Sequence, residues 1–215
     1  MTIQQALASA EAVLFDFDGI ILNSEWPIYQ TWLEVFQREG KDLPPDVYVQ
    51  CIGSDFDTWS PEKHLEDLTG KTFDWPEINA QRQVEIERNL QGSPPMAGVI
   101  PLLEKLSGQK TAVVSSSSHH WVDGWIETLN LTKHFETLVC RGDAPRIKPA
   151  PDLYLEGARQ LEVAPENCLV IEDSYNGMLS AHEAGMKVLA VPTALTEMMD
   201  FSNAEWQCRS LEEVL

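Results

Sequence analysis

The chain has 215 residues, which is enough for one large domain or for a core domain with an insertion. Acidic residues outnumber basic ones 34 to 15, so the formal net charge is −19, and a field of that sign repels nucleic-acid backbones. Apolar residues make up 43% of the chain, and no apolar run approaches the length that spans a bilayer. We therefore expect a globular protein with no nucleic-acid or membrane partner. The first residues lack the basic and apolar regions of a signal peptide, so we expect a cytoplasmic location.

The first predicted element is a buried β-strand, Ala12–Phe15, which is a short apolar run bounded by polar residues. An amphipathic helix is predicted over residues 26–39, where large apolar side chains recur at helical spacing. Residues 42–92 show further helical patterns and no convincing strand. We interpret residues 26–92 as a small helical bundle inserted after the first strand.

A cluster of breaking residues at 93–98 marks a change of character, and strand and helix patterns alternate beyond it. The predicted helices and strands, in chain order, are 99–106 (helix), 111–114 (strand), 121–129 (helix), 137–140 (strand), 152–161 (helix), 168–171 (strand), 174–184 (helix) and 187–191 (strand). Such alternation predicts an α/β fold, in which helices flank a Rossmann-like parallel sheet of five to six strands. Residues 1–25 and 93–215 would form this core.

Polar and charged residues stand at the ends of most of these strands. Asp16 and Asp18 follow the first strand, serines 115–118 follow the second, Lys148 lies in the loop before the fourth, and Glu172-Asp173 follow the fourth. The carboxyl ends of parallel strands share one edge of the sheet, so these groups would converge there. Paired carboxylates repel each other unless a cation or proton lies between them. Oxygen ligands suit Mg²⁺, and the absence of His and Cys from these motifs disfavours zinc.

The ordered motifs resemble the four motifs of the haloacid dehalogenase (HAD) superfamily: Asp16-Phe17-Asp18-Gly19, Val113-Val114-Ser115-Ser116, Lys148-Pro149 and Ile171-Glu172-Asp173-Ser174. Residues 148–154 and 172–177 look like the β-phosphoglucomutase-like and phosphoglycolate phosphatase-like branch. The helical insertion is similar to the helical cap of that branch. One such motif would be weak, whereas four in order at strand ends are specific.

The resemblance implies a Mg²⁺-dependent phosphatase that hydrolyses a small phosphomonoester through an aspartyl-phosphate. Asp16 would be the nucleophile, and Asp18 would be the general acid and then the general base. Lys148 would neutralise Asp16 and the phosphate. The residues implied for the metal are Asp16, Asp18 through its backbone carbonyl, Glu172 and Asp173. Those implied for phosphate or substrate are Ser115, Ser116, Lys148, Gly53 and Asn176, although Asn176 is equally well explained as a cap or as a residue that orients the metal loop.

Two alternatives to the phosphatase remain. Family mutases have a histidine where Ile28 stands and a cap-loop arginine near Gly53-Ser54-Asp55, and this chain lacks both, which favours hydrolysis of a sugar or polyol phosphate over a phosphosugar mutase. A non-catalytic phosphate-binding module is the other alternative, and the intact set of motif residues disfavours it. The partner would be a small-molecule phosphate ester, and a monomer is feasible. The sequence leaves open the roles of Ser117, Ser118, His119, His120 and Trp59.

Overall fold

The computed structural model describes residues 1–53 and 59–215, and within these residues six parallel strands form one sheet. The strands are β1 Ala12–Phe15, β2 Lys110–Ser118, β3 Thr137–Arg141, β4 Cys168–Glu172, β5 Lys187–Ala190 and β6 Trp206–Gln207. Their order is β3-β2-β1-β4-β5-β6, so the chain builds outward from β1 in both directions. The predicted α/β class is confirmed, and β1 lies at the switch point where such sheets bind ligands.

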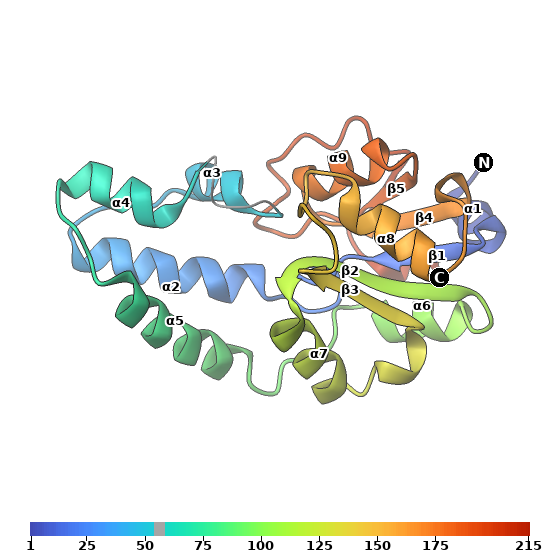
Figure 1. Ribbon diagram of the computed structural model, residues 1–215, viewed down its shortest axis with the longest axis horizontal. Helices are drawn as coiled ribbons and strands as arrows, with labels where there is room; N and C mark the ends of the chain where they lie inside the picture. Colours follow the sequence, from blue (N-terminus) through green and yellow to red (C-terminus); the bar gives the residue numbers. More distant parts are fainter. Residues whose placement is uncertain (54–58) are drawn as a thin grey trace.

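Helices cover both faces of the sheet, as Figure 1 shows. The helices that cover one face are α1 Ile3–Ser9, α6 Val99–Lys105 and α7 His119–Thr128, and those on the other are α8 Asp152–Gln160 and α9 Tyr175–Glu183. Alternate residues of β1 enter the two cores, because successive side chains of a strand point to opposite faces: Val13 and Phe15 pack on one side, Ala12 and Leu14 on the other.

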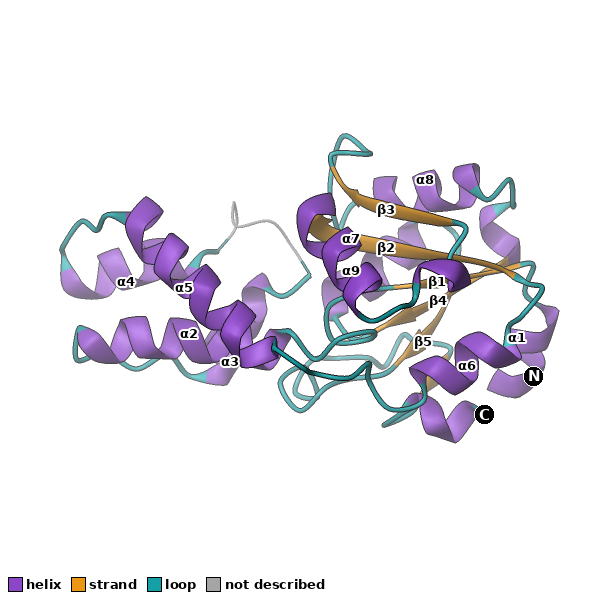
Figure 2. Cartoon of the chain, turned by 90° about the horizontal axis from the view of Figure 1, so that it is seen from below, coloured by secondary structure: helices purple, strands orange, loops and turns teal. Residues whose placement is uncertain are grey.

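A separate helical bundle follows β1 and extends away from the sheet (Figure 2). Its helices are α2 Glu25–Arg38, α3 Pro45–Tyr48, α4 Pro61–Thr69 and α5 Trp75–Leu90. The bundle has its own apolar core, in which Trp32 and Phe36 of α2 pack with Leu65 of α4. Among the described residues, no helix has the length and apolar character needed to cross a membrane.

The sequence patterns located most elements to within a few residues and missed others. Strand β2 continues through serines 115–118, which were expected to follow the strand, because it pairs with β3 again at Ser118 and Arg141 after a shift in register. Helix α7 begins at His119, two residues before the predicted start. The short elements α1 and β6 were not predicted, since seven and two residues carry little periodic signal.

Candidate active site

The residues after β1 enter the site in a tightly constrained loop. The Asp16 N–H donates to the carbonyl of Ile171 at 2.9 Å, which continues the β1–β4 pairing by one residue. Gly19 has φ of +85°, and a Cβ there would lie 2.1 Å from Oδ2 of Asp173. Only glycine therefore allows this loop to turn back beside the carboxylate that follows β4.

Lys148 places a positive charge beneath the strand ends. Its side chain is 1% exposed, and Nζ donates to Oδ1 of Asp16 at 2.5 Å, to Oε1 of Glu172 at 2.7 Å and to the carbonyl of Val114 at 2.8 Å. Burial alone would lower the pKa of Lys148, but the attraction of Asp16 and Glu172 outweighs it, so the pKa is raised and the ammonium is retained. A buried ammonium needs such partners, because an unpaired charge in the interior is very costly.

Glu172 connects the lysine to the start of α9. Its Oε1 accepts from Lys148 and from the Tyr154 hydroxyl at 2.9 Å, and its Oε2 accepts from the Asp173 N–H, the Ser174 N–H and the Ser174 hydroxyl at 3.0–3.1 Å. A Cβ on Gly177 would lie 1.8 Å from Oε1, so a glycine in the first turn of α9 makes room for the carboxylate. Both oxygens of Glu172 thus already have protein donors.

Three buried carboxylates meet at this point and have too little positive charge around them. One oxygen from each of Asp16, Glu172 and Asp173 lies within 4.8 Å of the others. Burial raises the pKa of Asp16 to about 8, with Lys148 opposing the shift and the neighbouring acids adding to it. Burial and the repulsion of Glu172 and Asp16 likewise raise the pKa of Asp173 well above its ordinary value. An all-oxygen, electrostatically strained cluster of this kind fits Mg²⁺.

Asp18 is held by three donors from three parts of the chain. Oδ1 accepts from the Ser24 hydroxyl at 2.5 Å and from the Trp121 indole N–H at 3.0 Å, and Oδ2 accepts from the Ser117 hydroxyl at 2.6 Å. The sequence left the role of Ser117 open and gave no reason to connect Ser24 or Trp121 with the site. Their contacts with Asp18 appear only when β1, β2 and α7 are brought together.

The serines of β2 form the wall opposite the carboxylates. Ser115 is buried, and its hydroxyl accepts from the Ser117 N–H at 3.0 Å. The carbonyl of Ser116 accepts from Nε of Arg141 at 2.9 Å, whereas its buried hydroxyl has no hydrogen-bond partner in the described part of the chain. Ser116 also lines the pocket, so its hydroxyl is placed to donate to a ligand there.

The helical bundle closes the site from the other side. A pocket of about 140 Å³ is lined on the sheet side by Asp16, Asp18, Asp173, Lys148 and serines 115–117, and on the bundle side by Glu25, Ile28, Tyr48 and Gly53. Burial, followed by the repulsion of Asp18 and Asp16, raises the pKa of Glu25 well above its ordinary value.

The loop after α3 rests on the start of α9. Nδ2 of Asn176 donates to the carbonyl of Ile52 at 2.8 Å, and a Cβ on Gly53 would lie 2.5 Å from the Ser174 hydroxyl. Gly53 also has φ of +70°, a conformation that favours glycine. Asn176 therefore joins the bundle to the loop that carries Asp173. Asp55, which stands near the position of the cap-loop arginine of family mutases, lies outside the described residues.

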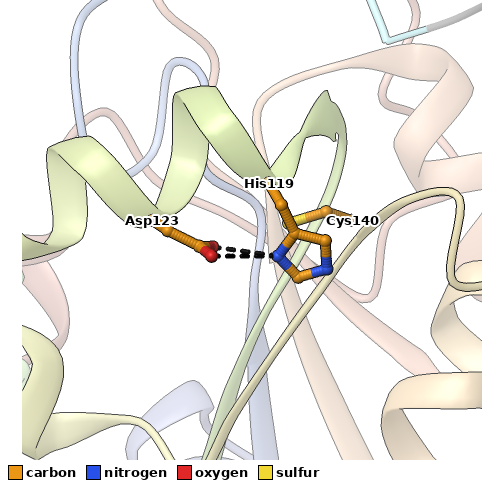
Figure 3. A group of neighbouring side chains, drawn as sticks. All are labelled: His119, Asp123 and Cys140. Carbon is orange, nitrogen blue, oxygen red and sulfur yellow. Dashed lines mark hydrogen bonds and ion pairs between the residues drawn. The ribbon is translucent and has the colours of Figure 1, made fainter.

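His119 belongs to a separate polar cluster at the start of α7, shown in Figure 3 with Asp123 and Cys140. Its ring nitrogens contact Asp123 at 3.0 Å and Asp143 at 2.7 Å, and the hydrogen bond with Asp123 is the main cause of its raised pKa. Burial raises the pKa of Cys140 to about 12, so its thiol stays protonated and is a poor metal ligand. His119 does not line the pocket.

The other residues whose roles were open lie outside the pocket. Ser118 and His120 line a neighbouring cavity. Trp59 packs against the core of the bundle, with its ring 5.5 Å from that of His64, which agrees with a structural role.

Comparison with known proteins places this site in a family. The sequence profile of the haloacid dehalogenase-like hydrolases matches residues 13–191. YhcW of Bacillus subtilis (strain 168), a proposed phosphatase, is 34% identical over 206 residues, which cover 95% of this chain and 93% of YhcW. The fructose-1-phosphate phosphatase YqaB of Escherichia coli (strain K12) is 27% identical over 181 residues, which cover 83% of this chain and 95% of YqaB.

A solved structure with bound phosphate has the same fold. A HAD-family hydrolase from Deinococcus radiodurans R1, crystallised with phosphate and sodium, superposes with a TM-score of 0.75 at 26% identity, covering 96% of this chain and 94% of that chain. The profile match spans most of the chain, and the chain aligns with nearly the whole length of each of the two relatives. The chain is therefore a member of the haloacid dehalogenase-like hydrolase family and an enzyme of its phosphoric monoester hydrolase class.

Proposed function

We propose that the enzyme is a Mg²⁺-dependent phosphatase that hydrolyses a small phosphomonoester, a sugar or polyol phosphate, through an aspartyl-phosphate. The observation that carries this proposal is the 2.5 Å contact between Nζ of Lys148 and Oδ1 of Asp16, at the rim of a pocket with an unpartnered serine hydroxyl. The ion pair fixes the carboxylate and offsets its charge. An anionic nucleophile can then approach an anionic phosphate without prohibitive repulsion.

The reaction would proceed in two displacements. The free oxygen of Asp16 attacks phosphorus, the bond to the leaving oxygen breaks, and that oxygen takes a proton from Asp18 and departs as the alcohol. Asp18 then removes a proton from water, which attacks the phosphorus of the aspartyl-phosphate and releases inorganic phosphate and the Asp16 carboxylate. Ser24, Ser117 and Trp121 would set the orientation of Asp18 for both proton transfers.

Ser115 and Ser116 would hold the phosphoryl oxygens, and Lys148, whose three N–H donors already have protein acceptors, would act on the phosphate through its charge. The unpartnered Ser116 hydroxyl supports this assignment, because a phosphoryl oxygen would satisfy it. Gly53 would approach the substrate from the bundle, since it lines the pocket. Asn176 would act one step away, by fixing the loop that ends in Gly53.

Asp16, Asp173 and the backbone carbonyl of Asp18 would hold Mg²⁺. When bound, the ion supplies positive charge that orients the phosphate and offsets the repulsion within the carboxylate cluster. The clustering of the buried Asp16 and Asp173 carboxylates and the close approach of Gly19 to Asp173 support this position. Glu172 would hold Lys148 in place and stand next to the metal, because both of its oxygens already accept hydrogen bonds from the protein.

Residues 26–92 would act as a cap on a core formed by residues 1–25 and 93–215. Glu25 lies in the pocket and would accept a hydrogen bond from a substrate hydroxyl, which suits a sugar or polyol. The substrate of the relative YqaB, fructose 1-phosphate, supports this class. Ile28 also lines the pocket, at the position where family mutases have a histidine, and so supports hydrolysis.

The direct test is phosphate release from a panel of sugar, polyol and aryl phosphates, with Mg²⁺ and with EDTA. We expect Mg²⁺-dependent release in which each mole of substrate consumed gives one mole of inorganic phosphate. Asp16→Asn should lower the rate by about 1,000-fold or more. Asp67→Asn, which changes an exposed aspartate of α4, serves as the matched control. Conversion of glucose 1-phosphate to glucose 6-phosphate without phosphate release would instead identify a mutase.

A further inference from the structure

The pocket around Asp16 is too small for a whole sugar phosphate. Its volume of about 140 Å³ falls below the roughly 300–1,000 Å³ typical of small-molecule sites. A second cavity of about 480 Å³ adjoins it between the bundle and the sheet, and the two share Ile28, Tyr48, Ser117 and Arg141 as walls. We call this second cavity the annex. A substrate whose phosphate reaches Asp16 has its body directed toward the annex.

Arg82 of α5 lies in the wall of the annex, where Glu62 is close enough to act on it electrostatically but does not form an ion pair with it. Its guanidinium stacks over the Trp32 ring at 3.4 Å from the centroid, and Nη1 donates to Oδ1 of Asn79 at 2.9 Å. Its Nε is buried without a hydrogen-bond partner, and no carboxylate lies within ion-pair distance in the described part of the chain. Burial lowers the pKa of Arg82 to about 10, so it stays charged at neutral pH.

Arg141, at the end of β3, faces both cavities from the opposite side. Its Nε donates to the carbonyl of Ser116, which anchors the guanidinium beside the serines of β2. The two acids that also line the annex are already engaged by neutral amides: Glu62 accepts from Asn79 at 2.7 Å and Glu87 from Gln83 at 2.8 Å. These hydrogen bonds leave both carboxylates charged, so the annex presents two guanidinium groups beside two carboxylates whose hydrogen bonds are made to other residues.

We propose that the annex binds a second anionic group of the substrate, a carboxylate or a further phosphate, and that Arg82 is its main ligand with Arg141 between the two sites. Guanidinium groups match both anions by paired hydrogen bonds, and the unpartnered Nε of Arg82 would gain its missing acceptor. This inference rests on the proposed phosphatase and narrows its substrates to phosphomonoesters with a negatively charged distal end.

The test compares pairs of substrates that differ in one anionic group. Fructose 1,6-bisphosphate is paired with fructose 1-phosphate, and 3-phosphoglycerate with glycerol 3-phosphate. We expect the wild type to show a higher kcat/KM for the member that carries the additional anionic group in at least one pair. The pair that shows this difference tells whether the bound group is a phosphate or a carboxylate. Arg82→Gln should lower the ratio of kcat/KM with the additional anionic group to kcat/KM without it by about 10- to 100-fold, chiefly through KM. Arg82→Lys should lower this ratio by less.

Arg88→Gln is the matched control, because it removes an exposed arginine from the same helix and should leave the ratio unchanged. If Arg82→Gln fails to fold, Arg141→Gln at the exposed end of β3 tests the same prediction with a reduced ratio. The proposal would be overturned if the wild type preferred the member without the additional anionic group in both pairs. It would also be overturned if neither arginine variant changed the ratio of the two kcat/KM values. Failure of the phosphatase itself would look different, since no substrate of either kind would release phosphate.

Discussion

At the scale of single residues, the site depends on Lys148, which holds its charge in the interior because oxygens surround it on three sides. Asp16 and Glu172 supply two of these oxygens and the carbonyl of Val114 the third. Tyr154 completes the arrangement from α8, since its hydroxyl donates to Glu172 and its ring lies 4.7 Å from Nζ. The lysine is thus both a structural and a catalytic element of the proposed mechanism.

Lys148→Met should abolish activity and also destabilise the fold. Removing the ammonium leaves two buried carboxylates without their cation, and breaking such a pair costs about 3–5 kcal/mol. We expect the free energy of unfolding, measured by urea denaturation, to fall by that amount. Lys133→Met at an exposed position is the control. An unchanged free energy of unfolding in Lys148→Met would show that the ion pair does not stabilise the folded state.

The sequence predicted Asp16, Asp18, Ser115 and Asp173 from their places after strands and Lys148 from the loop before Pro149, and all five line one pocket. It did not identify the residues that orient them. Trp121 is 103 positions from Asp18 and Tyr154 is 18 from Glu172, and neither contact leaves a periodic trace in the sequence. Such contacts depend on how helices pack on the sheet, which a single sequence does not show.

At the scale of secondary-structure elements, the loop after α3 connects the helical bundle to the carboxylate loop before α9. Gly53 and Ile52 supply the bundle side of this contact, and Ser174 and Asn176 the other. The Ser174 hydroxyl also donates to Glu172, so two residues, Ser174 and Glu172, connect the bundle loop to Lys148. A shift of this loop would therefore displace Ser174 and, through Glu172, Lys148.

Gly53→Ala should therefore impair catalysis more than backbone strain alone explains. The new Cβ would lie 2.5 Å from the Ser174 hydroxyl and force the loop away from α9. Gly40→Ala is a close control, because Gly40 has a similar φ of +66° at the end of α2 but no atom within 4 Å of its would-be Cβ. We expect kcat/KM to fall by about tenfold or more in Gly53→Ala and to change little in Gly40→Ala. Equal losses in both variants would refute a specific role for the contact.

Helix α8 carries Tyr154 to the site and is supported on its outer face by Glu156. Hydrogen bonds from Arg159 and Gln160 lower the pKa of Glu156 to about 2. The folded-state pKa is depressed, so this stabilisation is present above the ordinary pKa of 4.5 and is lost as the pH falls toward 2. Glu156→Gln should lower Tm slightly at neutral pH, and the difference from the wild type should vanish near pH 2. A Tm difference that persists in acid would contradict this account.

At the scale of the whole molecule, a parallel sheet and a helical bundle line one pocket, and their apolar cores are joined where Ile86 and Leu90 of α5 pack on the sheet side. The α/β class, the parallel sheet and the inserted helices could be predicted from hydrophobic periodicity, which is strong in strands such as β4 and helices such as α8. The annex could not, because it is formed by residues from α2, α3, α4, α5, β2, α7 and β3 that share no motif. If the annex binds the substrate as proposed, substrate selection would depend on a part of the molecule that the motifs do not describe.

The central claim is that Asp16 becomes covalently phosphorylated, and rapid acid quenching followed by mass spectrometry tests it most directly. The Asp18→Asn variant is mixed with Mg²⁺ and an activated aryl phosphate, whose leaving group needs no proton. The first displacement then proceeds while the second is slowed. We predict a phosphoryl group on the peptide that contains Asp16, and none in the Asp16→Asn, Asp18→Asn double variant. Phosphate release without any phosphorylated Asp16, or phosphorylation of a different residue, would contradict the mechanism.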